Sequence, residues 1–369
     1  MVVSHEASRT GAPRIAIEVI NALKKLDVEC VAVVRWPGPL FAAIQAAADR
    51  TRLEPLRRLR VGLRRFRQSR KLAIAAEERV ARRVLTWERP DLVWLNTVKS
   101  ACYVRSALEL DCKVVLHSHE LGALAQGTLA RYRLGDLYER VHLVACSQAA
   151  ANELHMAAGG GLVTVIPEAL DINRVRLSAT LPSTHHGLGR GATVVACGTA
   201  DQRKGTDLWI EVARQVWAVM GDRCPRFEWI GLDEGGRFET LARESHLDDK
   251  VEFIGAVENP YPMIAAATVV TVPSRQDAFP LVVLEAMALR KPVVAFDIGG
   301  IREQLDDTGM LVSPGDVAAM AAAVVGLLGD DQSRRSLGDA AALRVEELFE
   351  IGTFRRSVAE LVTEELGRP

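Results

Sequence analysis

Two acidic residues, Asp277 and Glu285, stand at the ends of an apolar stretch in the segment "SRQDAFPLVVLEAMAL". The run "VVTV" before it predicts a strand, and the apolar residues that follow predict a helix. At about 1.5 Å per residue the two acids lie up to about 12 Å apart, which is about the span from a sugar ring to a ribose across a diphosphate. Their carboxylates could accept hydrogen bonds from hydroxyl groups at the two ends. Amides at the helix start, around Phe279, Pro280 and Leu281, would hold the phosphates between them.

A structural role for the same two acids is the alternative. Asp277 would then cap the helix, and Glu285 would form a surface ion pair, for example with Arg290. An isolated pair of acids would favour this alternative. A second polar cluster favours the interpretation that the two acids bind a ligand.

That cluster lies in "VVACGTADQRKGTDLW", where Gly198 ends a predicted strand and Arg203 and Lys204 directly precede a predicted helix. Adjacent cations beside a helix N-terminus could neutralise a diphosphate, because each charge-assisted hydrogen bond contributes about 1.5 to 3 kcal/mol. Two solvated loop cations are the alternative. Taken together with Asp277 and Glu285, the cations predict a diphosphate site.

Polar residues in the first half of the chain leave two interpretations open. In "SHEASRTGAP", Gly11 could let the backbone approach an anion and Pro13 suits the first turn of a helix, but a tight turn needs no ligand. In "VVLHSHE", His117 and His119 end a predicted strand. We expect them to alternate in side, so that one faces a ligand, although hydrogen-bonded structural histidines are the common case.

The elements that must position these residues follow an α/β pattern. Short β-branched runs alternate with helical periodicity, which predicts parallel sheets covered by crossover helices. A polar segment at 178–192, rich in Gly, Ser, Thr and His, divides the runs into two series and predicts two Rossmann-like, doubly wound domains facing across a cleft. Ligands of such sheets collect outside the carboxyl ends of the strands. Strands are predicted at 2–4, 30–34, 92–96, 113–118, 143–147 and 163–166, and at 193–197, 227–230, 251–254, 269–272 and 293–296.

Length and composition predict the number of domains, the kinds of partner and the location of the protein. The 369 residues exceed the roughly 250 to 300 at which a single core stops growing. With 46 Lys and Arg against 47 Asp and Glu, the chain as a whole is not expected to bind nucleic acid. Six scattered cysteines predict reduced core thiols and a cytoplasmic location, and neither a signal peptide nor a membrane span is expected.

One segment, 50–71, departs from this balance because it is densely basic and contains a single acid, Glu54, among interleaved apolar residues. Such a pattern could lie on an anionic membrane surface, as a peripheral contact at the inner face of the cell membrane. A solvated helix face is the alternative, and both interpretations stay open.

Several motifs together resemble a known family. They are "VACS", "VIPEALD", "GTADQRKG", "FIGAV" and "VPSRQDAFPLVVLEAMALRKPVVAFDIGGIRE", in this order along nearly the whole chain. This set is similar to family four of the retaining GT-B glycosyltransferases, and "VSHEASRTGAP" resembles the opening of one bacterial branch. The resemblance implies an acceptor-side domain at 1–172, a nucleotide-sugar donor domain at 173–350, and a final helix at 351–369 that packs back onto the first domain.

The resemblance also implies residue roles. Asp277 would bind hydroxyls of the donor sugar and Glu285 the ribose, and His119 matches the family's cleft histidine better than His117 does. The first acid is normally Glu, and Glu168 stands where Asn is common, which could change the hinge. The remaining donor-binding residues would be Arg203 and Lys204 as the cation pair, Gly11, Gly198, Phe279, Pro280 and Leu281 around sugar and diphosphate, and Val257 by the base.

The expected activity is transfer of a sugar from a nucleoside diphosphate sugar to an acceptor hydroxyl, with retention of anomeric configuration. The acceptor would be a glycan, a lipid-linked sugar or a small molecule. No cofactor and no metal are expected, because the Asp-Asp pairs at 306–307 and 330–331 lack supporting ligands. A catalytically idle nucleotide-sugar binding protein of the same fold is the alternative.

Overall fold

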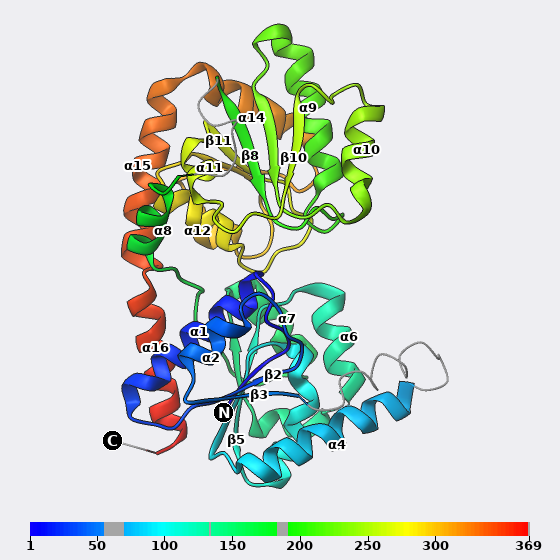
Figure 1. The fold of residues 1–369 in the computed structure, drawn as a ribbon, viewed down its shortest axis with the longest axis vertical. Helices are drawn as coiled ribbons and strands as arrows, with labels where there is room; N and C mark the ends of the chain where they lie inside the picture. The colour runs from blue at the N-terminus through cyan, green and yellow to red at the C-terminus, as the bar shows by residue number, and fades with distance from the viewer. Residues whose placement is uncertain (55–69, 133, 183–190, 368–369) are drawn as a thin grey trace. The chain divides into compact units, whose positions relative to one another are not determined.

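The computed structural model describes residues 1–54, 70–132, 134–182 and 191–367. The chain forms two compact units, drawn in Figure 1. Unit 1 contains Met1–Glu168 and Gly352–Pro369, and unit 2 contains Ala169–Ile351. The predicted limits of the second domain, 173 and 350, lie within a few residues of the limits of unit 2, which are Ala169 and Ile351. No helix in the described part of the chain has both the length and the apolar character needed to cross a membrane.

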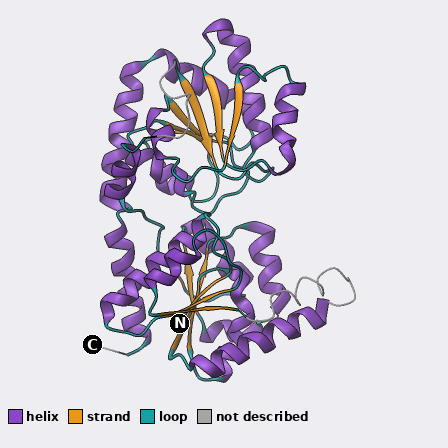
Figure 2. Cartoon of the chain, viewed as in Figure 1, coloured by secondary structure: helices purple, strands orange, loops and turns teal. Residues whose placement is uncertain are grey.

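Unit 1 is built on a seven-stranded sheet with the order β3-β2-β1-β4-β5-β6-β7, in which every pair is parallel. A parallel sheet needs helices on both faces, and Figure 2 shows helices surrounding its strands. The strands are β1 (Val2–Ser4), β2 (Val31–Val34), β3 (Arg50–Leu53), β4 (Leu92–Leu95), β5 (Lys113–Ser118), β6 (His142–Ala145) and β7 (Val163–Val165). In the described residues of this unit the α-helices are α1 (Gly11–Leu23), α2 (Phe41–Ala47), α4 (Arg70–Glu88), α5 (Val104–Glu109), α6 (Gly122–Tyr132), α7 (Gln148–Ala157) and α16, which begins at the junction (Ile351–Glu365).

Unit 2 repeats this architecture with six parallel strands in the order β10-β9-β8-β11-β12-β13. The strands are β8 (Thr193–Cys197), β9 (Arg226–Ile230), β10 (Val251–Gly255), β11 (Val269–Val272), β12 (Val293–Phe296) and β13 (Met310–Val312). The α-helices are α8 (Ile172–Ala179), α9 (Thr206–Met220), α10 (Arg237–Glu244), α11 (Tyr261–Ala266), α12 (Leu281–Ala288), α13 (Ile301–Leu305), α14 (Val317–Gly329) and α15 (Asp331–Leu348).

Most predicted strands are confirmed, five of them residue for residue: 2–4, 113–118, 193–197, 269–272 and 293–296. Two edge strands, β3 and β13, were missed. The first four residues of the basic segment form β3, and its cations pair at the sheet edge with acids: Arg50 with Glu29 at 2.9 Å, and Arg52 with Glu88. Charged side chains are typical of an edge strand, so alternation of apolar residues could not reveal it. Residues 55–69 of the predicted membrane segment 50–71 lie outside the described residues.

The final helix packs in unit 1, where the resemblance placed it. Phe354 is 2% exposed and stacks on the ring of His117 with centroids 6.4 Å apart. The Arg355 guanidinium donates two hydrogen bonds to Glu18 of α1, and His142 pairs with Glu365 at 2.9 Å. These contacts tie residues more than 200 positions apart in the sequence into one core.

A buried ionic network in unit 1 includes Glu54, the acid of the basic segment. The Arg35 guanidinium donates to Glu54 at 3.0 Å, and its side chain is 3% exposed. The hydroxyl of Tyr103 donates to the same carboxylate at 3.0 Å, and Glu77 of α4 lies 3.9 Å from Arg35. Glu54, the single acid of the basic segment, therefore neutralises a buried arginine.

Candidate functional site

The loops that follow β8 and β11 meet at the carboxyl edge of the unit 2 sheet. These strands are adjacent and parallel, so their exit loops lie side by side. The backbone amide of Arg275 donates to the carbonyl of Arg203 at 2.8 Å. Gly205 permits this close approach, because it has a φ of +72° and a Cβ there would lie 1.9 Å from the carbonyl oxygen of Pro273. The two loops thus bring together residues that lie about 70 positions apart in the sequence, such as Arg203 and Arg275.

Asp277 lies directly against the predicted cation pair. The Lys204 ammonium donates to Asp277 Oδ2 at 2.5 Å, and Arg203 Nη1 is 3.8 Å from the same oxygen. Lys204 and Asp277 are 16% and 12% exposed, whereas Arg203 is 47% exposed. The helix-cap alternative for Asp277 is wrong, because α12 begins after Pro280 and has no side-chain cap.

Glu285 lies inside α12, all eight residues of which are buried. Glu285 is 4% exposed. Its carboxylate accepts a hydrogen bond from the hydroxyl of Tyr261 at 3.3 Å. The alternative of a surface ion pair with Arg290 is wrong, since Arg290 pairs with Asp339 at 2.7 Å. A buried carboxylate needs hydrogen-bond donors, and Tyr261, a partner that sequence reasoning missed, supplies one.

The residues at the start of α12 are buried, with Phe279 and Leu281 4% and 8% exposed. Pro280 has no amide hydrogen and cannot donate to a phosphate. Its carbonyl accepts a hydrogen bond from Gln304 at 3.1 Å, which anchors the helix start to α13. Of the three residues predicted to offer amides, only Phe279 and Leu281 carry the required N–H group.

Gly198 has a φ of +141°, and the aliphatic stem of Lys204 passes 3.4 Å from the place where a Cβ would stand. Its carbonyl accepts from Trp229 Nε1 at 2.7 Å. A hollow of about 10 Å³, bordered by the preceding residue Cys197, is lined by Lys204, Ser274 and Val282, among other residues. Val257 is half-buried between β10 and α11.

The predicted site residues of unit 1 are Gly11 and His119. Gly11 is the first residue of α1 and is half-buried. His119 follows β5, and its Nδ1 lies 2.6 Å from Glu168 Oε1, with both side chains 5% exposed. Glu168, which we expected to change only the hinge, contacts the histidine directly. His119 Nε2 is buried and has no hydrogen-bond partner among the described residues.

The expectation that His117 and His119 alternate in side is wrong. Their ring centroids lie 4.0 Å apart, because residues two positions apart along an extended chain share a face. His117 is fully buried between Trp94 and Phe354, and burial holds its pKa well below the usual value, so the ring is neutral.

Within the described ranges, one group of side chains has the composition of a metal site. His119, Cys146 and Glu168 follow β5, β6 and β7, and their nitrogen, sulfur and oxygen atoms all lie within 4.8 Å of one another. These ligand types suit zinc. In the structure, Glu168 uses one oxygen to contact His119 Nδ1.

Comparisons with known proteins agree with this architecture. The family model described as "Glycosyltransferase Family 4" matches residues 9–174, and the model described as "Glycosyl transferases group 1" matches residues 191–330. HepE of Anabaena, solved with UDP and glucose, superposes with a TM-score of 0.78 over 98% of each chain at 20% identity. Fold and sheet order define a GT-B protein. The chain belongs to glycosyltransferase family four, among the group 1 glycosyl transferases.

Two curated relatives are similar over parts of their length. D-inositol 3-phosphate glycosyltransferase of Geodermatophilus obscurus is 31% identical over 61% of this chain and 52% of its own. N-acetyl-alpha-D-glucosaminyl L-malate synthase of Bacillus anthracis is 35% identical over 30% of this chain and 29% of its own. The chain therefore spans about half or less of the length of these relatives.

Proposed function

We propose that the protein is a retaining glycosyltransferase that moves a sugar from a nucleoside diphosphate sugar to an acceptor hydroxyl without a metal. The observation that carries this proposal is the contact of Lys204 and Arg203 with Asp277 at the carboxyl edge of the unit 2 sheet. A site that holds two cations beside a hydroxyl-binding carboxylate suits a sugar diphosphate. HepE, the similar structure, is solved with UDP-glucose, which supports a donor of this class.

Different residues bind the diphosphate, the sugar and the ribose of the donor during the reaction. Departure of the diphosphate builds negative charge, which Lys204 and Arg203 stabilise. Lys204 then exchanges its contact with Asp277 for one with phosphate, and Asp277 is released to accept a hydrogen bond from a sugar hydroxyl. Glu285 binds the ribose. The leaving phosphate oxygen takes the proton of the incoming hydroxyl on the same face, so retention requires no protein nucleophile.

Partners and location follow from the same proposal. The acceptor is a glycan, a lipid-linked sugar or a small molecule, as the names of the relatives, which include an inositol phosphate glycosyltransferase, support. All six cysteines are free thiols, which supports a reducing compartment such as the cytoplasm.

A thermal-shift panel of nucleoside diphosphates tests this function. A nucleotide present at about 100 times its Kd should stabilise the protein by about 2.7 kcal/mol, with the same shift in excess chelator. A shift that disappears with chelator would contradict the metal-free site, and the absence of any shift would contradict the donor site. The idle-binder alternative predicts the same shift but neither transfer nor donor hydrolysis.

Glu168 is the positioning residue for His119 in this proposal, because its carboxylate accepts a hydrogen bond from Nδ1–H and leaves Nε2 free to contact a ligand. We expect Glu168→Gln to lower the rate of transfer by about 10- to 100-fold, the equivalent of a charge-assisted hydrogen bond of about 1.5 to 3 kcal/mol. Glu365→Gln is the matched control, since it removes a similar contact to His142 at 2.9 Å in the same unit. Equal rates in the two variants, measured beside their melting temperatures, would show that Glu168 has no positioning role.

A further inference from the structure

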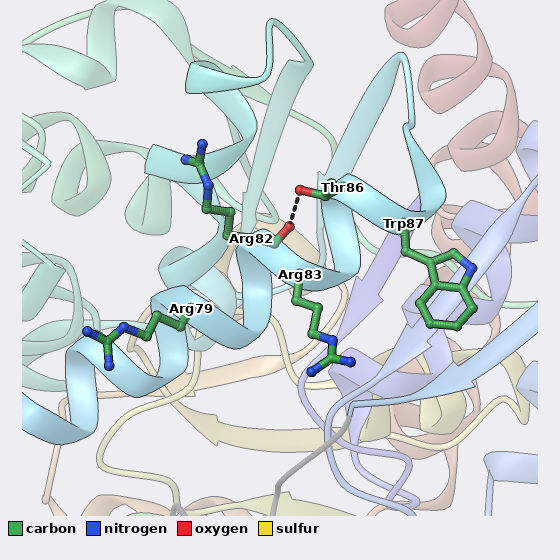
Figure 3. A pocket seen from close by; sticks show the side chains of 5 residues that line it. All are labelled: Arg79, Arg82, Arg83, Thr86 and Trp87. Carbon is green, nitrogen blue, oxygen red and sulfur yellow. Dashed lines mark hydrogen bonds between the residues drawn. The ribbon is translucent and has the colours of Figure 1, made fainter.

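The outer face of α4 presents a stripe of cationic and apolar side chains. Leu72, Arg79, Arg83 and Trp87 follow one another at steps of seven, four and four residues, which places them on one side of a helix. Leu72 and Trp87 are 65% and 67% exposed. Figure 3 shows the hollow that Arg79, Arg82, Arg83, Thr86 and Trp87 line at one end of the stripe. The opposite side of the helix is buried through Ala73, Glu77, Val80, Ala81, Val84 and Leu85.

The acids of α4 are buried or paired with cations, so the outer face of the helix is positive. Glu77 is 1% exposed. Glu78, 28% exposed as a side chain, lies 4.0 Å from Arg105, and the Glu88 side chain, 1% exposed, pairs with Arg50 at 3.3 Å. Arg82 pairs with Glu109 across the surface. Within the part of the chain that the structure describes, Arg79 and Arg83 have no ion-pair partner.

The two large apolar side chains are unusual for a surface in water. Leu72 and Trp87 are fifteen residues apart, so at about 1.5 Å per residue they stand about 22 Å from each other, with arginines between them. The guanidinium of Arg52, which also pairs with Glu88, lies over the Trp87 ring, 4.8 Å from its centroid. Indole rings and long cationic side chains are the residue types that settle at the headgroup level of a bilayer.

We propose that the stripe Leu72–Arg79–Arg83–Trp87 is a docking surface for an anionic phospholipid membrane. The arginines contact lipid phosphates, and the two apolar ends enter the boundary between headgroups and acyl chains. A soluble acidic partner would satisfy the arginines but would leave Leu72 and Trp87 in water. This inference stands apart from the donor site, because every residue of the stripe lies on α4 in unit 1.

Co-sedimentation of the whole chain with vesicles tests the surface. Vesicles of phosphatidylcholine mixed with phosphatidylglycerol should bind the protein, those of phosphatidylcholine alone much more weakly, and added salt should weaken binding. The double variant Arg79→Glu, Arg83→Glu should lose at least tenfold in affinity for anionic vesicles, since each cation near such a surface contributes close to a factor of five. Trp87→Ser should lose affinity as well, with the melting temperature of each variant measured beside it.

The controls are exposed residues of the same types in unit 2. Arg223→Glu with Arg335→Glu makes the same change of charge, and Trp217→Ser on α9 removes an indole that is 38% exposed; both should leave vesicle binding unchanged. Quenching by brominated phosphatidylglycerol should be smaller in Trp87→Phe than in the unchanged protein. The proposal is overturned if both charge variants lose binding alike, if no vesicle binds, or if only replacement of Arg57, Arg58, Arg64 and Arg65 abolishes binding.

Discussion

Lys204→Ala should lower the rate of sugar transfer by about two orders of magnitude or more, the usual effect of removing a group preorganised for charge that develops in the transition state. The ammonium is 16% exposed and stands 2.5 Å from Asp277, so it is held in place before any donor binds. The variant also leaves the Asp277 carboxylate with only the more distant Arg203, at 3.8 Å. Initial rates at saturating donor, measured with the melting temperature, separate loss of catalysis from loss of structure.

Lys250→Ala is the matched control for this experiment. Lys250 forms an ion pair with the neighbouring Asp249 at 3.2 Å in the same unit, away from the exit loops of β8 and β11, and its removal should leave the rate unchanged. Glu285→Ala should lower the rate by a similar factor to Lys204→Ala. Near-normal rates in both Lys204→Ala and Glu285→Ala would count against the site as a whole.

Arg35→Met should destabilise the protein by about 3 to 5 kcal/mol, because it leaves the buried Glu54 carboxylate without its cation. The arginine and this glutamate are 3% and 1% exposed as side chains, so water cannot replace the missing donor. Urea unfolding followed by circular dichroism measures the loss.

An exposed pair provides the comparison. Arg302→Ala removes a contact with Asp297 in which the arginine is 64% exposed, and it should leave the free energy of unfolding nearly unchanged. If the unpaired Glu54 carboxylate causes the loss of stability, the double variant Arg35→Met, Glu54→Leu should be more stable than Arg35→Met alone. An equally small loss for Arg35→Met and Arg302→Ala would show that the buried pair contributes no more than a surface one.

Local patterns were sufficient for much of the fold. Runs of β-branched residues mark strands such as β5, β8, β11 and β12, because a buried parallel strand is apolar on both faces. Chain order then places the loops after β8 and β11 at one sheet edge, and Lys204 and Asp277 with them. Edge strands such as β3 escaped detection, since charged residues there pair with acids from distant segments and leave no local period.

The partners of individual side chains required the folded chain. Nothing near Glu285 in the sequence indicates Tyr261, and nothing near His119 indicates Glu168, which is 49 residues away. Side-chain contacts of this kind depend on strand order and on the direction in which each strand exit turns, neither of which has a local signature. Residue types and spacing thus specify which chemistry the chain carries, whereas long-range packing specifies which groups touch, because only packing brings distant segments within hydrogen-bond distance.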